Sequence, residues 1–212
     1  ARQARATVLG GGKVHRPIPA DARAPGKGTS HARRLVTDAK VAMLLWSCLT
    51  TVAAAMPPVA TEANTVQLAG SPVGVPPGQG GWLFRLPQSN SVMAYAMVGH
   101  MKKMGIKTVG FLGYTDAYGE QWLKAFTPLA EKEGIKIIGT ERFARTDTSV
   151  TPQALKLVAS NPDAMLIVAT GSGAAMPEMA IVERGFKGKI YQTHAAGAPE
   201  RQRIGGRGVE GP

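Results

Sequence analysis

The sequence predicts an α/β fold with a parallel sheet covered by helices on both faces. Between residues 82 and 192, short apolar segments of strand length alternate with longer segments of helical periodicity. The strand segments are rich in apolar residues, which is typical of parallel strands buried on both faces. Residues 82–212 are therefore expected to form one α/β domain.

The expected strands of this domain are short and rich in apolar residues. They cover residues 82–85, 108–112, 135–138, 164–169 and 189–192. Because helical segments separate them, consecutive strands are expected to be joined by crossovers and to run in parallel.

Four helices are expected between these strands, the first over residues 89–104. Asp116 is placed to cap the second helix, which ends before Gly134, and Thr151 with Pro152 is typical of the start of the third. The fourth is expected from about residue 175 to residue 184. One face of the first helix is formed by Met93, Met97, His100, Met101 and Met104.

Residues 1–81 are less regular. Residues 1–28 are rich in Ala, Arg, Gly and Pro, and we expect irregular or disordered chain there. Residues 29–81 are expected to form a partial domain followed by a Pro/Gly-rich linker over 71–81. Its elements would be helices over 30–39 and 50–56 and strands over 41–45 and 65–68.

The positive charge is concentrated at the N-terminal end. The chain carries a formal net charge of +11, and residues 1–40 contain nine basic and two acidic residues. That basic stretch has no aromatic residue, whereas nucleic-acid-binding surfaces interleave basic and aromatic side chains. We therefore expect no nucleic-acid partner.

Cysteine and histidine usage argues against a metal site. Cys48 is the one cysteine, so no disulfide can form within the chain. The four histidines are far apart in sequence and none forms a ligand-spaced pair. We expect no metal and no cofactor.

Residues 41–61 carry no charge and follow several basic residues, a pattern that a membrane segment can also show. Polar residues and the pair Pro57-Pro58 interrupt the run, so we expect no stable membrane insertion. A secretory signal would normally start nearer the N-terminus, and this chain shows no convincing one.

Three features leave enzymatic and binding interpretations open. Cys48 follows an expected strand, where a nucleophile can sit, but its apolar neighbours favour a buried inert thiol. The turn Thr170-Gly171-Ser172-Gly173 lies between a strand and a helix, and is either a plain tight turn or an anion-contacting one. Tyr118 lies near the end of another strand, at the edge where such sheets bind ligands. No catalytic residue is assigned.

Several motifs occur together in a specific order. FLGYTDAYGEQWLKAF is followed by ERFARTDTSVTPQALKLVASNPDAMLIVATGSG and then by RGFKGKIYQTHAAG. This combination resembles the type I periplasmic solute-binding proteins, the substrate-binding components of ABC importers for branched-chain amino acids and related compounds. The resemblance implies two three-layer, parallel-sheet lobes joined by hinge strands, closing on a ligand. Residues 82–212 would be the second lobe.

The resemblance also implies ligand-binding positions. In the second lobe these are a tyrosine, a turn after a strand and a further contact point. In the first lobe they are hydroxyl and backbone groups after two strands. Carried onto this sequence, the positions are Cys48, Thr50, Ala69, Ser71, Tyr118, Ser172, Gly173 and His194.

The first lobe departs from the family pattern. Trp46 and Ser47 replace the family's Gly and Pro, and Cys48 and Leu49 replace its Ser/Thr pair. The family's opening strand has no counterpart, and the chain stops at Pro212, before the family's return to the first lobe. We therefore expect an incomplete first lobe.

The resulting hypothesis is the substrate-binding component of an ABC importer for branched-chain amino acids or related small carboxylates. It would be periplasmic, would meet a transporter permease, and would perform no catalysis. A non-functional fragment and a ligand-sensing regulatory domain of the same fold are the alternatives. An enzyme that uses Cys48 or the Gly171 turn is a third hypothesis.

Overall fold

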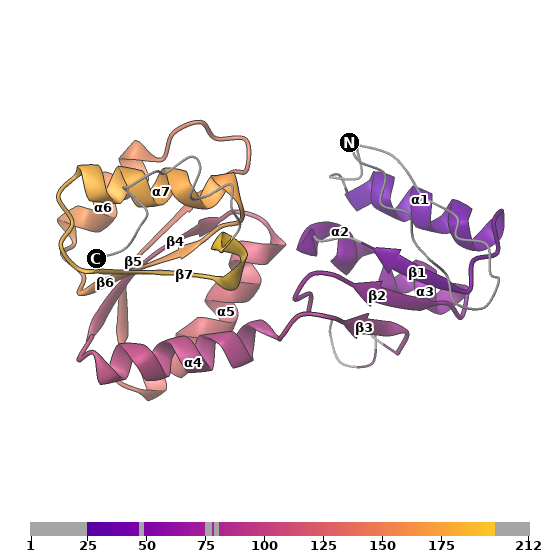
Figure 1. Ribbon diagram of the computed structural model, residues 1–212, viewed down its shortest axis with the longest axis horizontal. Coiled ribbons are helices and arrows are strands. Elements are labelled where there is room, and N and C mark those ends of the chain that lie inside the picture. The colour runs from indigo at the N-terminus through magenta and orange to yellow at the C-terminus, as the bar shows by residue number, and fades with distance from the viewer. Residues whose placement is uncertain (1–24, 47–48, 75–77, 79–80, 198–212) are drawn as a thin grey trace. The chain divides into compact units, whose positions relative to one another are not determined.

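The computed structural model describes residues 25–46, 49–74, 78 and 81–197. The chain forms two compact units, which divide between Pro87 and Gln88. We call residues up to Pro87 unit 1 and residues from Gln88 unit 2 (Figure 1).

The described part of unit 1 is a small parallel sheet with three helices. Its strands follow the order β1-β2-β3, and the last residue of β1, Trp46, pairs with the last residue of β2, Ala69. The carboxyl ends of these two strands are therefore level at one edge. Its elements are α1 (Pro25–Thr37), β1 (Met43–Trp46), α2 (Thr50–Ala55), α3 (Pro57–Glu62), β2 (Val66–Ala69) and β3 (Leu83–Arg85).

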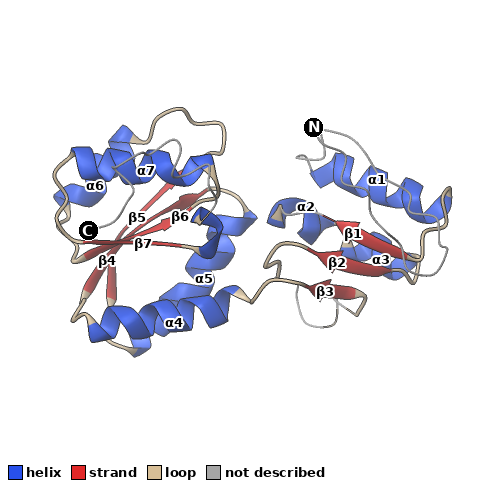
Figure 2. Cartoon of the chain, in the orientation of Figure 1, coloured by secondary structure: helices blue, strands red, loops and turns tan. Residues whose placement is uncertain are grey.

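Unit 2 has three layers around a four-stranded parallel sheet of order β5-β4-β6-β7. Helices α4 and α5 lie on one face of the sheet, and α6 and α7 lie on the other (Figures 1 and 2). This arrangement confirms the predicted α/β fold. The elements are α4 (Asn90–Lys103), β4 (Thr108–Tyr114), α5 (Ala117–Lys132), β5 (Lys136–Phe143), α6 (Thr151–Ala159), β6 (Ala164–Val168), α7 (Ser172–Glu183), β7 (Lys189–Gln192) and the short 3₁₀ helix η1 (His194–Ala196).

The core of unit 2 follows from its apolar strands. Every residue of β6 is buried, as expected for a central parallel strand covered on both sides. From α5, Trp122 and Phe126 are fully buried beneath the sheet. Asp116 caps α5 as predicted, because its carboxylate accepts from the backbone N–H groups of Tyr118 and Gly119.

Helix α4 buries only part of the predicted face. Its buried residues are Asn90, Ala94, Val98 and Met101, while Met104 is 49% exposed. Of the predicted face, Met101 is completely buried, whereas His100 is exposed. Met93 and Met97 pack against the core only partly buried.

Four predicted boundaries need correction. β3 pairs with β2, so the strand expected to open the second domain belongs to unit 1. α1 begins at Pro25, although residues up to 28 were expected to be irregular. α6 is capped at Val150 rather than Thr151, and α7 begins at Ser172, three residues before the expected start.

The start of α1 has a packing explanation. Gly28 is buried inside the helix, and a Cβ there would lie 2.4 Å from Cγ1 of Val52 in α2. Glycine lowers helix propensity, but here it permits close contact between two helices. The proline pair after α2 breaks that helix as expected, and Pro57 then starts α3, because proline is tolerated at a first helical position.

Across the described ranges, none of the helices has the length and apolar character needed to cross a membrane.

Candidate functional site

The candidate site of unit 2 is the carboxyl edge of its sheet. β4 pairs with β5 on one side and with β6 on the other, so the chain leaves β4 and β6 toward opposite faces. The loops after β4 and β6 therefore diverge at a topological switch point. Open α/β sheets bind ligands in the crevice that forms there.

Arg145 joins three loops at this carboxyl edge. It follows β5, and its Nε donates to Oδ2 of Asp116, after β4, at 2.5 Å. Its Nη1 donates to Oγ1 of Thr170, after β6, at 3.0 Å. Its guanidinium carbon lies 4.0 Å from the centre of the Tyr114 ring, a cation–π contact. We call Tyr114, Asp116, Arg145 and Thr170 the Arg145 cluster.

Within this cluster, the Tyr114 side chain is held in place by hydrogen bonds and ring packing. Its hydroxyl donates to the carbonyl oxygen of Thr170 at 3.4 Å and accepts from the Thr170 N–H at 3.5 Å, and its ring packs against Phe143. A Cβ at Gly173 would lie 2.0 Å from the Tyr114 hydroxyl. Glycine at this position in α7 therefore leaves room for the Tyr114 side chain.

Tyr118 lies beneath the edge and is 3% exposed. Its hydroxyl lies 2.8 Å from Oγ1 of Thr193, and the Thr193 hydroxyl is 3.4 Å from the carbonyl oxygen of Ala169. Burial raises the pKa of Tyr118 to about 12, against the opposing effects of the Thr193 and Trp122 side chains and the Arg145 charge. The phenol is neutral at physiological pH and supports the residues after β6 and β7.

His194 stands at the same edge, at the start of η1. The Gly171 N–H donates to the carbonyl oxygen of Ala195 at 3.2 Å, which ties the turn after β6 to η1. His194 is exposed, yet partial burial lowers the pKa of its imidazole, so the neutral form dominates at pH 7. Ser172 is the first residue of α7.

In unit 1, the predicted residues lie at the carboxyl edge of β1 and β2. Thr50 begins α2 and is 2% exposed, Ala69 ends β2, and Ser71 follows two residues later with 1% exposure. The buried Ser71 hydroxyl has no hydrogen-bond partner within the part of the chain that is described. Cys48 lies outside the described residues.

A buried amide holds this edge together. Gln67 in β2 is completely buried, and its Nε2 donates to the carbonyl oxygen of Ala53 in α2 at 3.0 Å. Ala53, Ala69 and Val73 form a small apolar cluster beside it. The helix that carries Thr50 is thereby fixed on the strand that carries Ala69.

The predicted residues thus fall into two groups, one on each unit. Tyr118, Ser172, Gly173 and His194 share the carboxyl edge of unit 2, and Thr50, Ala69 and Ser71 share that of unit 1. Whether each residue contacts a ligand stays a prediction.

Sequence reasoning missed Arg145 and Thr193. Both lie in motifs that carry the family resemblance, the RTDTSVT and YQTH segments. Arg145 lies two residues after the end of β5, and Thr193 directly follows β7. Their position just after a strand was the sequence signal that could have identified them. It did not suffice, because only the folded chain shows that Arg145 reaches back to Asp116 and across to Thr170.

Each of the carboxylates near this edge binds a different partner. Asp116 binds Arg145, and Asp147 accepts from the Ala144 N–H at 2.8 Å, so the two do not form an acid–base pair. Glu178 of α7 is buried and accepts from Gln192 at 2.6 Å. Within the described stretches, no three His, Cys, Asp or Glu side chains gather as metal ligands. These carboxylates therefore serve as hydrogen-bond acceptors for neighbouring groups.

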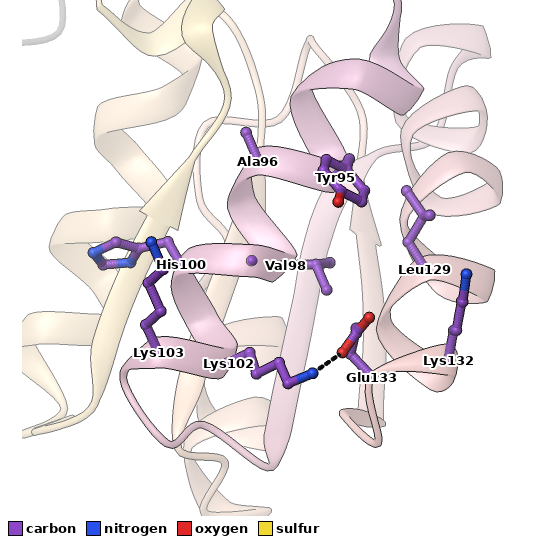
Figure 3. Close-up of a pocket in the computed structure, with 10 residues that line it drawn as sticks. Tyr95, Ala96, Val98, His100, Lys102, Lys103, Leu129, Lys132 and Glu133 are labelled. Atoms are coloured by element: carbon purple, nitrogen blue, oxygen red, sulfur yellow. Dashed lines mark hydrogen bonds and ion pairs between the residues drawn. The ribbon is translucent and has the colours of Figure 1, made fainter.

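A surface pocket of about 500 Å³ lies elsewhere on unit 2, between α4 and α5 (Figure 3). Lys102 points toward Glu133 near the carboxyl ends of these helices, with Nζ 2.5 Å from Oε2. Those helix ends precede β4 and β5, so they lie at the opposite edge of the sheet from Arg145. None of the predicted site residues lines this pocket.

Comparison with known proteins identifies relatives over most of the chain. A family model described as periplasmic binding protein matches residues 3–212. No curated protein sequence gives a significant match. Among solved structures, an extracellular ligand-binding receptor from Rhodopseudomonas palustris is 44% identical with a TM-score of 0.86, and the match covers 89% of this chain and 52% of that one.

More distant structures share the fold. A leucine-binding protein, LivK, from Thermotoga maritima is 22% identical with a TM-score of 0.78, over 89% of this chain and 54% of that one. An ABC transporter solute-binding protein from R. palustris in complex with benzoate is 18% identical with a TM-score of 0.75, over 89% of this chain and 53% of that one. The chain spans about half the length of these structures.

Proposed function

The chain belongs to the periplasmic binding protein family, and on that premise we propose that it binds a small carboxylate as the substrate-binding component of an ABC importer. Branched-chain amino acids and related small carboxylates are the proposed ligands. The ligand leaves unchanged, so the function is binding without catalysis. Export to the periplasm and delivery to a transporter permease complete the proposal.

One observation carries this proposal most strongly. At the carboxyl edge of unit 2, Arg145 links the three loops that leave β4, β5 and β6. A guanidinium fixed at a topological switch point offers a positive charge and several N–H donors where such sheets bind ligands. An anionic small molecule is the chemistry that fits these donors.

Two relatives support the ligand class. The structure from T. maritima is described as a leucine-binding protein, and the R. palustris solute-binding protein was solved with benzoate. Both compounds carry a carboxylate. The carboxylate that leucine and benzoate have in common therefore supports small carboxylates as the proposed ligands.

Calorimetry with the full 212-residue chain tests the proposal. The panel contains leucine, isoleucine, valine, benzoate and 4-methylpentanoate, with glucose as a neutral control of similar size. A one-to-one complex with one of the carboxylates, at a Kd of about 100 μM or tighter, is the expected result. No heat from any carboxylate, under conditions where the chain is folded by circular dichroism, would overturn the proposal.

A further inference from the structure

Arg145 is held in one orientation by contacts on three sides. Nε binds the Asp116 carboxylate at 2.5 Å, Nη1 binds the Thr170 hydroxyl at 3.0 Å, and the Tyr114 ring lies beneath the guanidinium at 4.0 Å. Since a long side chain normally loses freedom when it binds, this arrangement lowers the entropic cost of binding a ligand.

The positioned guanidinium keeps donor capacity for a ligand. The bonds to Asp116 and Thr170 use two of the five N–H donors of the guanidinium, and the Arg145 side chain is 32% exposed. Asp116 also caps α5, so its charge is bound to the helix N-terminus as well as to Arg145. Asp116 is thus a positioning residue for Arg145.

The same edge offers little to an ammonium group. An ammonium has only donors and needs acceptors, ideally a carboxylate. Among the described residues here, Asp116 is bound by Arg145 and by two backbone N–H groups, and Asp147 accepts from the Ala144 N–H. At the start of η1, the exposed side chain is the imidazole of His194.

From this distribution of charge we infer that the ligand is a carboxylate without an α-ammonium group, and that Arg145 determines this specificity by binding the carboxylate. The inference rests on the proposed function and narrows its ligand class. An α-amino acid presents the same carboxylate together with a positive charge, which Arg145 repels at short distance.

Matched ligand pairs separate the two classes by calorimetry on the full chain. Leucine is compared with 4-methylpentanoate, and phenylalanine with 3-phenylpropionate. Each pair has the same carbon skeleton and differs only in the ammonium group. The expected result is that at least one of the two acids without an amino group binds about tenfold or more tightly than its amino acid.

An amide isolates the role of the negative charge. 3-Phenylpropionamide keeps the size of 3-phenylpropionate and loses its charge. The variant Arg145→Gln should weaken binding of the tighter-binding acid by on the order of 10- to 100-fold, the usual effect of losing a charged hydrogen bond. The same variant should change the affinity of the amide by no more than about twofold.

Arg142→Gln is the matched control. Arg142 lies in β5 and pairs with an acid, Glu120, at 2.5 Å, but among the described residues its side chain makes no bond to the loops after β4 and β6. This variant removes the same charge from the protein. It should leave acid and amide affinities unchanged, which excludes an effect of net charge alone. Thermal unfolding of both variants shows whether they remain folded.

Each outcome decides a separate question. Tighter binding of both amino acids than of their acids would overturn the inference and leave the proposed function standing. Equal weakening of acid and amide by Arg145→Gln would show that Arg145 only braces the loops, and would also overturn the inference. If neither class binds the wild-type chain, the proposed function falls and the inference falls with it.

Discussion

The hydroxyl of Tyr118 lies 2.8 Å from Oγ1 of Thr193, and both side chains are 3% exposed. Tyr118 is in the first turn of α5 and Thr193 follows β7, so this bond joins two elements that are far apart in the sequence. The Thr193 hydroxyl also lies 3.4 Å from the carbonyl oxygen of Ala169, just after β6. The bond therefore supports the edge where we place the ligand.

Tyr118→Phe should destabilise unit 2. Loss of the Tyr118 hydroxyl leaves the buried Thr193 hydroxyl with one hydrogen-bond partner fewer. The free energy of unfolding should therefore fall by about 1–2 kcal/mol. Urea denaturation followed by circular dichroism measures this loss. Tyr95→Phe is the control, because Tyr95 is 71% exposed and its substitution should change little. Equal stability of both variants would contradict the role of the bond.

Two helical glycines should respond oppositely to alanine. A Cβ at Gly119, in α5, would lie against the backbone carbonyl of Tyr114, whereas Gly99 in α4 has no atom within 4 Å of such a Cβ. Gly99→Ala should stabilise the chain by about 1 kcal/mol through helix propensity. Gly119→Ala should destabilise it, because rigid backbone cannot give way. Thermal unfolding compares them, and stabilisation by both would show that the Gly119 contact is not tight.

Asp163 should make stability depend on pH in the acid range. Its carboxylate accepts from the N–H groups of Lys107 and Thr108 at 2.8 Å each, and these bonds hold its pKa below the ordinary value of 3.8. The folded state therefore binds this proton less readily than the unfolded state. The stabilisation is present above pH 3.8 and is lost as pH falls through the lower pKa of the folded state.

Asp163→Asn tests this pH dependence. At neutral pH the variant should be less stable by about 1 kcal/mol, a figure that allows for solvent screening of an exposed carboxylate. The difference from wild type should shrink as pH falls below 3.8. Asp38→Asn is the control, since the exposed Asp38 carboxylate contacts side chains of its own segment, the Thr37 hydroxyl at 2.9 Å and Arg34 at 4.0 Å. A pH-independent difference would refute the assignment to Asp163.

The sequence predicted the order of elements in unit 2 because local signals and tertiary structure agree there. Apolar runs mark the buried strands, Asp116 caps α5, and Gly105 and Gly134 adopt φ of +73° after their helices. The family resemblance is confirmed by the match over residues 3–212.

Other features depended on contacts that no local pattern encodes. The sequence of the short strand at 83–85 gives no sign of which sheet it joins, and the glycines of α1 argue against the helix that forms. Tertiary packing of Gly28 against Val52 overrides that propensity. Arg145 escaped notice for the same reason, since its partners lie 29 and 25 positions away in sequence.

Nuclear magnetic resonance tests most directly whether the carboxyl edge of unit 2 contacts a small carboxylate. The ¹⁵N-labelled chain is titrated with the tightest carboxylate found by calorimetry. We expect the largest changes in amide chemical shift at Arg145, Gly171, Gly173 and His194, with little change at Lys102 and Glu133. Shifts concentrated around the α4–α5 pocket, with none at the carboxyl edge, would contradict this expectation.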